Sequence, residues 1–144
     1  VTPIKNQAIA YLEDHGWKKE EKWPVGERKR PGNMDAALHL ESGQTISFEW
    51  ETGNVSSSHR SINKICLGLL TEALIAGILV VPSRKLYPYL TDRIGNYEEL
   101  EPYFDLWRAT PCKEGVFDIV VIEHDAESFD VPRIPKGTDG RAQS

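Results

Sequence analysis

The chain has 144 residues, of which 40% are hydrophobic and 27% are charged, and its formal net charge is −5. This length fits one domain with a sizeable core, and the acidic balance argues against a protein that mainly coats nucleic acid non-specifically. No apolar run reaches the roughly 18 residues of a membrane span, so no membrane partner is expected. With only Cys66 and Cys112 and no evident signal peptide, we expect a cytoplasmic setting without disulfides.

Apolar periodicity and turn residues divide the chain into predicted elements. In order, the pattern predicts a helix at 5–15, a hairpin with strands at 33–40 and 45–51, a helix at 59–76, a strand at 78–81, helical segments at 84–93 and 97–108, and a strand at 115–123. We expect the serines at 56–58 to cap the long helix and Gly77 to end it. This order predicts an α/β fold with a small mixed β-sheet flanked by helices.

The domain prediction comes from the same pattern. Residues 1–127 are expected to form a single domain. Residues 128–144 lose apolar content and gain proline and glycine, which predicts a mobile C-terminal tail.

Two acidic side chains share one face of the second hairpin strand. On this strand Ile46, Phe48 and Trp50 point to one side, whereas Glu49 and Glu51 point to the other. Residues two apart on a strand are separated by roughly 6.5 Å, and like charges at that distance repel unless a cation or solvent screens them. A metal site at the end of this strand is the most economical interpretation.

Asp35 on the first hairpin strand, together with Glu49-Trp50-Glu51 on the second, resembles the Asp…(Asp/Glu)-X-Lys signature of the PD-(D/E)XK nuclease superfamily. The departure is Glu51, where most members carry Lys. BamHI-type restriction endonucleases carry Glu there, and BglII-like ones carry Gln. Residues 53–56, Gly-Asn-Val-Ser, are also similar to the segment directly after the acidic strand in this group. The resemblance spans about residues 4–125 and implies a restriction-endonuclease-like core.

The resemblance implies a Mg²⁺-dependent deoxyribonuclease of the type II restriction class, with Mn²⁺ as a possible substitute. Asp35, Glu49 and the carbonyl of Trp50 would be the metal ligands, because Mg²⁺ prefers carboxylates, waters and phosphate oxygens. Glu51 would orient or deprotonate the attacking water. Double-stranded DNA is the expected substrate and a homodimer the expected assembly, since cutting both strands needs two sites. The resemblance also suggests a GATC-containing palindrome as the recognition sequence.

Further residues are expected around this centre. The signature has Lys at the position of Glu51, and Lys64 is predicted to substitute for that missing lysine. Glu13 in the first helix is a weaker candidate for a further acidic residue. A basic run before Asp35 can clamp the DNA backbone, and a helix N-terminus favours phosphate, although the serines there can equally serve as simple caps. The residues expected to contact DNA are Arg28, Lys29, Arg30, Asn54, Ser57, Ser58, His59 and Arg60. No role is predicted for the loop at 93–96.

Two other interpretations stay open. The chain can be a non-catalytic nucleic-acid-binding or protein-interaction module that keeps a nuclease fold, or the acids can form a plain exposed sheet face. A two-carboxylate glycosidase is disfavoured, because its acids face each other across a cleft, whereas Glu49 and Glu51 share one strand.

Overall fold

The computed structural model describes residues 2–90, 95–132 and 135 of the chain. Its strands form one five-stranded sheet in the order β1-β2-β3-β4-β5. The strands are β1 Lys18–Lys19, β2 Ala36–His39, β3 Thr45–Trp50, β4 Ala76–Pro82 and β5 Val116–Ile122. The pairs β1–β2 and β2–β3 are antiparallel, whereas β3–β4 and β4–β5 are parallel. The predicted α/β fold with a small mixed sheet is therefore confirmed.

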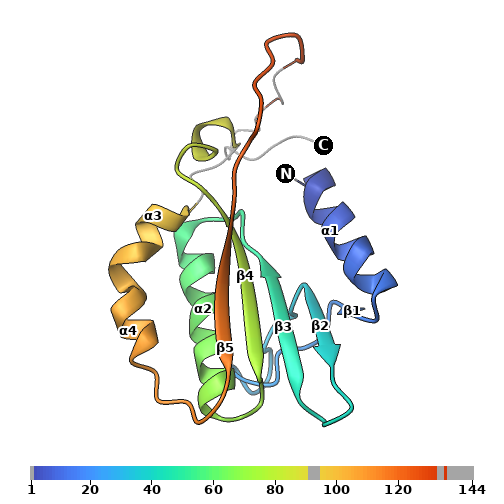
Figure 1. Cartoon of the computed structure of the whole chain (residues 1–144), viewed down its shortest axis with the longest axis vertical. Helices are drawn as coiled ribbons and strands as arrows, with labels where there is room; N and C mark the ends of the chain where they lie inside the picture. Colours follow the sequence, from blue (N-terminus) through green and yellow to red (C-terminus); the bar gives the residue numbers. More distant parts are fainter. Residues whose placement is uncertain (1, 91–94, 133–134, 136–144) are drawn as a thin grey trace.

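Helices lie against both faces of this sheet (Figure 1). Their bounds are α1 Thr2–Asp14, α2 Val55–Leu70, α3 Tyr97–Leu100 and α4 Phe104–Arg108, with short 3₁₀ turns η1 Tyr87–Tyr89 and η2 Glu101–Tyr103. No helix within the described residues is both long and apolar enough to cross a membrane.

Alternation along the strands produces two separate cores. On one face, Ala37, Leu79 and Val81 pack with Ile62 and Ile65 of α2. On the other face, Ala36, Phe48 and Val80 pack with Ile9 of α1. Adjacent residues of a strand therefore pack into different cores, because successive side chains of a strand point to opposite faces of the sheet.

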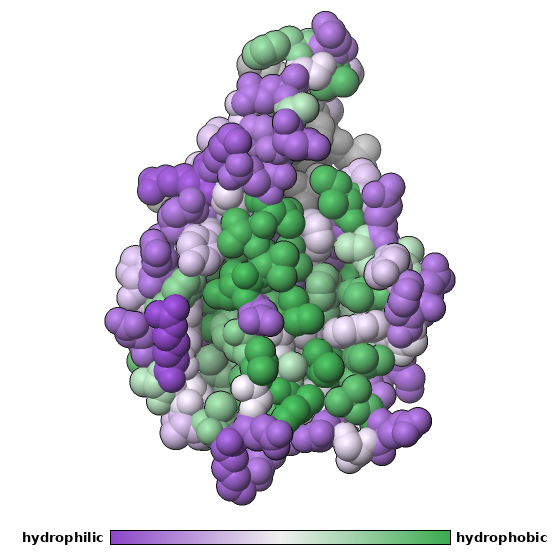
Figure 2. All heavy atoms as spheres, viewed as in Figure 1, coloured by the Kyte–Doolittle hydropathy of each residue, from purple (hydrophilic) through white to green (hydrophobic). Residues whose placement is uncertain are grey.

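The second of these faces is only partly covered. Apolar side chains remain visible over the central strands of the sheet (Figure 2). Val116 and Val120 of β5 are 55% and 45% exposed, although the adjacent β4 is mostly buried. The layer that α1 forms therefore leaves part of β5 open.

The N-terminal boundary of α2 corrects the prediction. This helix begins at Val55, so residues 56–58 form its first turn and do not precede it. The cap is Asn54, whose Oδ1 accepts a hydrogen bond from the Ser57 backbone N–H at 3.1 Å. Asparagine is as good an N-cap as serine. Asn54 precedes the serines in the chain, so α2 begins directly after Asn54.

The C-terminal boundary of α2 also differs from the prediction. The helix ends at Leu70, and Glu72 adopts a left-handed φ of 61°, which interrupts helical geometry. Gly77 lies inside β4 instead of ending the helix. A Cβ atom there would come within 2.3 Å of Ile65 Cγ2, so glycine is required by the close approach of α2 to the sheet.

The remaining helical predictions are partly wrong. Residues 84–90 contain only η1, and residues 91–93 lie outside the described part of the chain. The helix predicted at 97–108 is divided into α3, η2 and α4, because Pro102 has no backbone N–H to continue the helix.

Within the predicted tail, residues 128–132 have no regular secondary structure, and 133–134 and 136–144 are outside the described residues.

Candidate active site

The sheet register brings three carboxylates together at one end of the hairpin. Ala36 of β2 pairs with Phe48 of β3, so continuing the antiparallel register places Asp35 opposite Glu49. Asp35 lies just before β2, which is shorter than the predicted strand 33–40. Glu49 is the penultimate residue of β3, and Glu51 comes directly after its end.

Two donors hold the carboxylate of Asp35. The Nζ of Lys5 in α1 lies 2.5 Å from Oδ1, and the backbone N–H of Trp50 donates to Oδ2 at 2.8 Å. The Asp35 side chain is only 15% exposed. Because one oxygen binds the hairpin itself and the other binds α1, the position of Asp35 depends on two layers of the fold.

Glu49 is the most perturbed group of this cluster. Its residue is 6% exposed, and Oε1 has no hydrogen-bond partner among the described residues. Burial raises the pKa of Glu49 to about 8, with further upward contributions from the charges of Asp35 and Glu51, whereas the ammonium of Lys5 acts to lower it. An acceptor atom without a partner in a buried site is costly, and such atoms mark candidate functional sites.

Glu51 is anchored by α2. The Ser61 hydroxyl donates to Glu51 Oε1 at 2.7 Å, and Ser61 is buried against the sheet. Burial raises the pKa of Glu51, and the hydrogen bond from Ser61 acts in the opposite direction. A carboxyl group of raised pKa is better matched to proton transfer near neutral pH than an ordinary glutamate.

Sequence reasoning missed both Lys5 and Ser61. Lys5 is thirty residues away from Asp35, and Ser61 ten residues from Glu51. A polar residue on a helix carries no local sign of the side chain it will meet. Glu13, the acid considered from the first helix, is exposed and lies roughly two turns beyond Lys5.

The structure places Lys64 beside the loop that precedes β2. Its ammonium donates to the backbone carbonyl of Pro31 and lies 5.6 Å from the Trp23 ring centroid. Within the described residues Lys64 forms no ion pair with Asp35 or Glu49. Burial lowers the pKa of Lys64. A catalytic role for Lys64 stays a prediction.

Five of the eight residues predicted to contact DNA lie on two basic surfaces. Arg28, Lys29 and Arg30 are all exposed in the loop before β2. A groove on the outer side of α2 brings His59, Arg60 and Lys64 together, and its lining residues are Val55, Ser56, His59, Arg60, Asn63, Lys64 and Leu67. Both basic surfaces are accessible to backbone phosphates of DNA.

Three of the predicted contacts, Asn54, Ser58 and His59, are buried or already have partners within the fold. The Asn54 side chain caps α2 and accepts the hydrogen bond from Ser57. Ser58 is fully buried, and its Oγ has no partner among the described residues, so its burial counts against a contact with DNA. The His59 ring packs edge-on against Tyr103, with centroids 4.7 Å apart.

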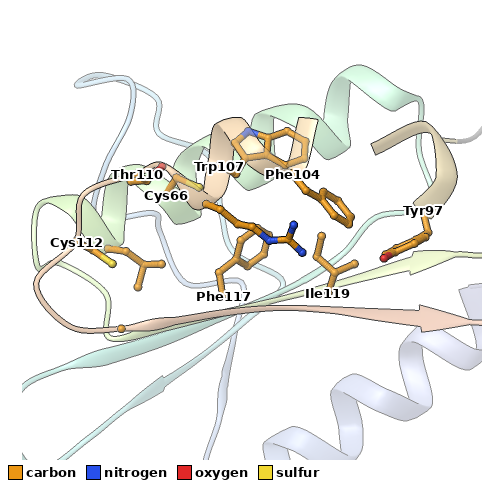
Figure 3. Close-up of a pocket in the computed structure, with 11 residues that line it drawn as sticks. Cys66, Tyr97, Phe104, Trp107, Thr110, Cys112, Phe117 and Ile119 are labelled. Carbon is orange, nitrogen blue, oxygen red and sulfur yellow. The ribbon is translucent and has the colours of Figure 1, made fainter. Parts of the chain in front are cut away.

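A separate cavity of about 430 Å³ lies between α2, α4 and β5. Figure 3 shows aromatic and thiol side chains around it, from these elements, from α3 and from the loop before β5. The residues that line it are Cys66, Leu69, Tyr97, Phe104, Trp107, Arg108, Thr110, Cys112, Gly115, Phe117 and Ile119. None of the three clustered carboxylates is among them, so this mainly apolar space is distinct from the acidic centre.

The acidic centre fits an open oxygen site more closely than a closed metal cage. Among the described residues, no three His, Cys, Asp or Glu side chains are grouped closely enough to enclose a metal ion. Mg²⁺ does not need such a cage, since one or two carboxylates with waters and substrate phosphates suffice. The unpartnered Oε1 of Glu49, with Asp35 opposite it on the neighbouring strand, is compatible with an open site of that kind.

Comparison with known proteins agrees with this geometry. The family model described as Restriction endonuclease BamHI matches residues 1–141 of the chain. The chain belongs to the BamHI restriction endonuclease family. Within this family it is 49% identical over 142 residues to the type II restriction enzyme OkrAI of Oceanobacter kriegii, covering 99% of this chain and 73% of that protein. It is 38% identical over 149 residues to BamHI of Bacillus amyloliquefaciens, covering 99% and 68%.

Membership of the BamHI family confirms the resemblance inferred from the acidic hairpin. The chain is accordingly a DNA endonuclease, and its reaction is the hydrolysis of phosphodiester bonds. Restriction enzymes of this type generally use divalent metal ions, which agrees with a cluster of carboxylates at the end of β3.

Proposed function

We propose that this BamHI-family endonuclease cuts double-stranded DNA with Mg²⁺ held by Asp35, Glu49 and the carbonyl of Trp50, and that Mn²⁺ can substitute. The supporting observation is the buried, unpartnered Oε1 of Glu49 next to two further carboxylates. Removing a charge from water without a partner is expensive, and a divalent cation would offset this cost. When bound, the metal polarises a phosphate oxygen and activates water.

The residues of the chain then divide the work. Before the metal binds, Lys5 and the Trp50 N–H hold the Asp35 carboxylate in a single arrangement. Ser61 holds Glu51 by one oxygen, which leaves the other free to accept a proton from the attacking water. The raised pKa of Glu51 suits this general-base role.

DNA binding is assigned to the two basic surfaces. Arg28, Lys29 and Arg30 would neutralise backbone phosphates, and so would Arg60 near the start of α2. The N–H groups of the first turn of a helix also favour phosphate, which gives Ser57 and His59 a place at the same contact. The described residues of one chain form one acidic centre of this kind, so a homodimer would provide the two sites needed to cut both strands. We expect it to act in the cytoplasm.

Cleavage of supercoiled plasmid tests this proposal directly. Wild-type protein should cut with Mg²⁺ or Mn²⁺ and stop when EDTA is added, and Glu49→Ala should not cut with either metal. Glu123→Ala, which removes an exposed carboxylate outside the cluster, is the matched control and should cut normally. Cutting in EDTA, or normal cutting by a folded Glu49→Ala variant, would contradict the proposed site.

A folded wild-type protein that binds duplex DNA without cutting it under any of these conditions would favour the non-catalytic module instead. The intact set of three carboxylates argues against that alternative.

A further inference from the structure

Lys5 supplies a positive charge to the acidic centre from outside the hairpin. Its Nζ lies 2.5 Å from Asp35 Oδ1, although the two residues are thirty positions apart. The Lys5 side chain is 32% exposed and the Asp35 side chain 15%, so the pair lies at the rim of the buried cluster. Lys64, the other ammonium considered for this site, is bound to Pro31.

The two oxygens of Asp35 are not equivalent. Oδ2 is bound by the Trp50 N–H, a backbone group that moves only with β3. Oδ1 is bound by Lys5, whose flexible four-carbon stem lets its ammonium move away without disturbing the helix. Oδ1 is therefore the oxygen that Asp35 can offer to a metal ion, and Lys5 now occupies it.

We propose that Lys5 is a positioning residue that takes the place of the divalent cation while the site is metal-free, and that it must leave Asp35 Oδ1 when the metal binds. This inference rests on the proposed function. In the metal-free protein Lys5 keeps Asp35 aligned and reduces the repulsion among the three carboxylates. The metal would then bind a preformed site. It would have to displace the Lys5 ammonium, whose positive charge would remain nearby and weaken metal binding.

The proposal predicts opposite effects for two measurements. Removing the charge of Lys5 should destabilise the metal-free protein, because three carboxylates lose their only ion-pairing cation among the described residues. The same change should tighten metal binding, because a competitor has gone. A lysine with a purely structural role would lower stability and weaken metal binding together.

The experiment compares wild type with Lys5→Met, which keeps the aliphatic stem, and with Lys5→Arg, which keeps the charge. Mn²⁺ binding to the DNA-free protein is measured by calorimetry, and thermal unfolding is measured in EDTA. Lys5→Met should bind Mn²⁺ about tenfold more tightly and unfold at a lower temperature in EDTA. Lys5→Arg should bind Mn²⁺ no more tightly than wild type.

Lys113→Met is the control, because it removes the lysine of another ion pair, Lys113 Nζ to Glu72 Oε1 at 3.1 Å, on the exposed surface. It should leave Mn²⁺ affinity unchanged. If Lys5→Met does not unfold cooperatively, Lys5→Gln replaces it, since its amide still donates to Asp35 without a charge.

The outcomes separate the two proposals. Wild-type binding with equal or weaker binding by the uncharged Lys5 variant overturns the inference and leaves the proposed metal site intact. Binding by neither protein overturns both. Tighter binding by the uncharged variant, including binding that is detectable only in that variant, supports the inference.

Discussion

Carboxylates lie at the ends of two parallel strands on either side of β4, and their surroundings are opposite. Glu49 near the end of β3 is 6% exposed, has an unpartnered oxygen, and has a pKa raised by burial to about 8. Glu123 directly after β5 is exposed and pairs with Lys85 at 2.7 Å, and that hydrogen bond lowers its pKa. The residue type and the place in the sheet are similar, but only one carboxylate has its charge satisfied.

The difference teaches where a cation is needed. The charge of an exposed carboxylate is already stabilised by a lysine and by bulk water, so it needs no further cation. Such surface ion pairs contribute little to stability. A buried carboxylate beside two others is stable only if it keeps a proton or acquires a cation. Substitutions at the two ends of the sheet should therefore have unequal effects on cleavage and on stability.

The largest difference should appear in catalysis. Asp35→Ala removes a proposed metal ligand and the acceptor of two hydrogen bonds, so we expect the rate of DNA cleavage to fall by about 10³-fold or more. Asp118→Ala, a substitution in β5 away from the cluster, should retain near-wild-type cleavage. Single-turnover cleavage at saturating Mg²⁺ provides the comparison, and equal rates for the two variants would remove Asp35 from the site.

The second prediction concerns the stability of the metal-free protein as a function of pH. Because the pKa of Glu49 rises from 4.5 to about 8 on folding, the native state keeps a proton in that window that the unfolded state has lost. The free energy of unfolding should therefore fall as pH rises through this window, by up to about 1.4 kcal/mol per pH unit from Glu49 alone. The raised pKa of Glu51 acts in the same direction.

Urea denaturation in EDTA between about pH 5 and pH 8 measures this slope. Glu49→Gln should reduce the slope to the part that Glu51 contributes, and saturating Mn²⁺ should reduce the slope in the wild type. Glu123→Gln should keep the wild-type slope, since the lowered pKa of Glu123 places its titration below this range. A wild-type curve without any slope in EDTA would contradict the burial argument for Glu49.

A smaller effect is expected from the anchor of Glu51. Ser61→Ala removes the hydroxyl that donates to Glu51 Oε1, so the carboxylate loses its orientation but not its presence. We expect kcat to fall roughly tenfold, as for other groups that position a functional side chain, while DNA affinity stays unchanged. Ser42→Ala in the hairpin turn is the control. A loss of affinity with unchanged kcat would show that Ser61 acts on DNA binding instead.

The smallest effect should come from the exposed pair. Lys85→Met breaks the contact with Glu123, but the Glu123 carboxylate remains solvated, so the unfolding midpoint and the cleavage rate should both stay at wild-type values. Differential scanning calorimetry and plasmid cleavage check this. A large loss of stability would mean that the exposed pair is more important than its surroundings suggest.

Local pattern predicted much of the scaffold. The alternation of Ile46, Phe48 and Trp50 with Glu49 and Glu51 defined the strand and both of its faces, because a strand has a period of two wherever it lies. The hairpin and the mixed sheet were predicted from the order of elements. The resemblance carried by Asp35 and the acidic strand was confirmed by the family comparison.

Element boundaries were harder to predict, because they depend on what packs nearby. Gly77 is a helix stop by its residue type, yet it is needed where α2 approaches β4 too closely for a Cβ atom. The serines at 56–58 have good capping chemistry, but Asn54 stands earlier in the chain and caps first. In both cases the predicted helix boundary was wrong because the residue type suits two structural roles. Only the packing of the fold determines which role it takes.

The chemistry of the acidic centre shows the same division. Strand periodicity alone indicated two carboxylates on one face of a strand, because a two-residue repeat is a local property, and the family resemblance added Asp35 on the neighbouring strand. The electrostatic state of those carboxylates was decided by folding, which buried Glu49 and brought in Lys5 from α1 and Ser61 from α2. Burial and ion pairing depend on distance in space. The sequence around Lys5 gives no local sign that its ammonium will pair with Asp35, thirty residues away.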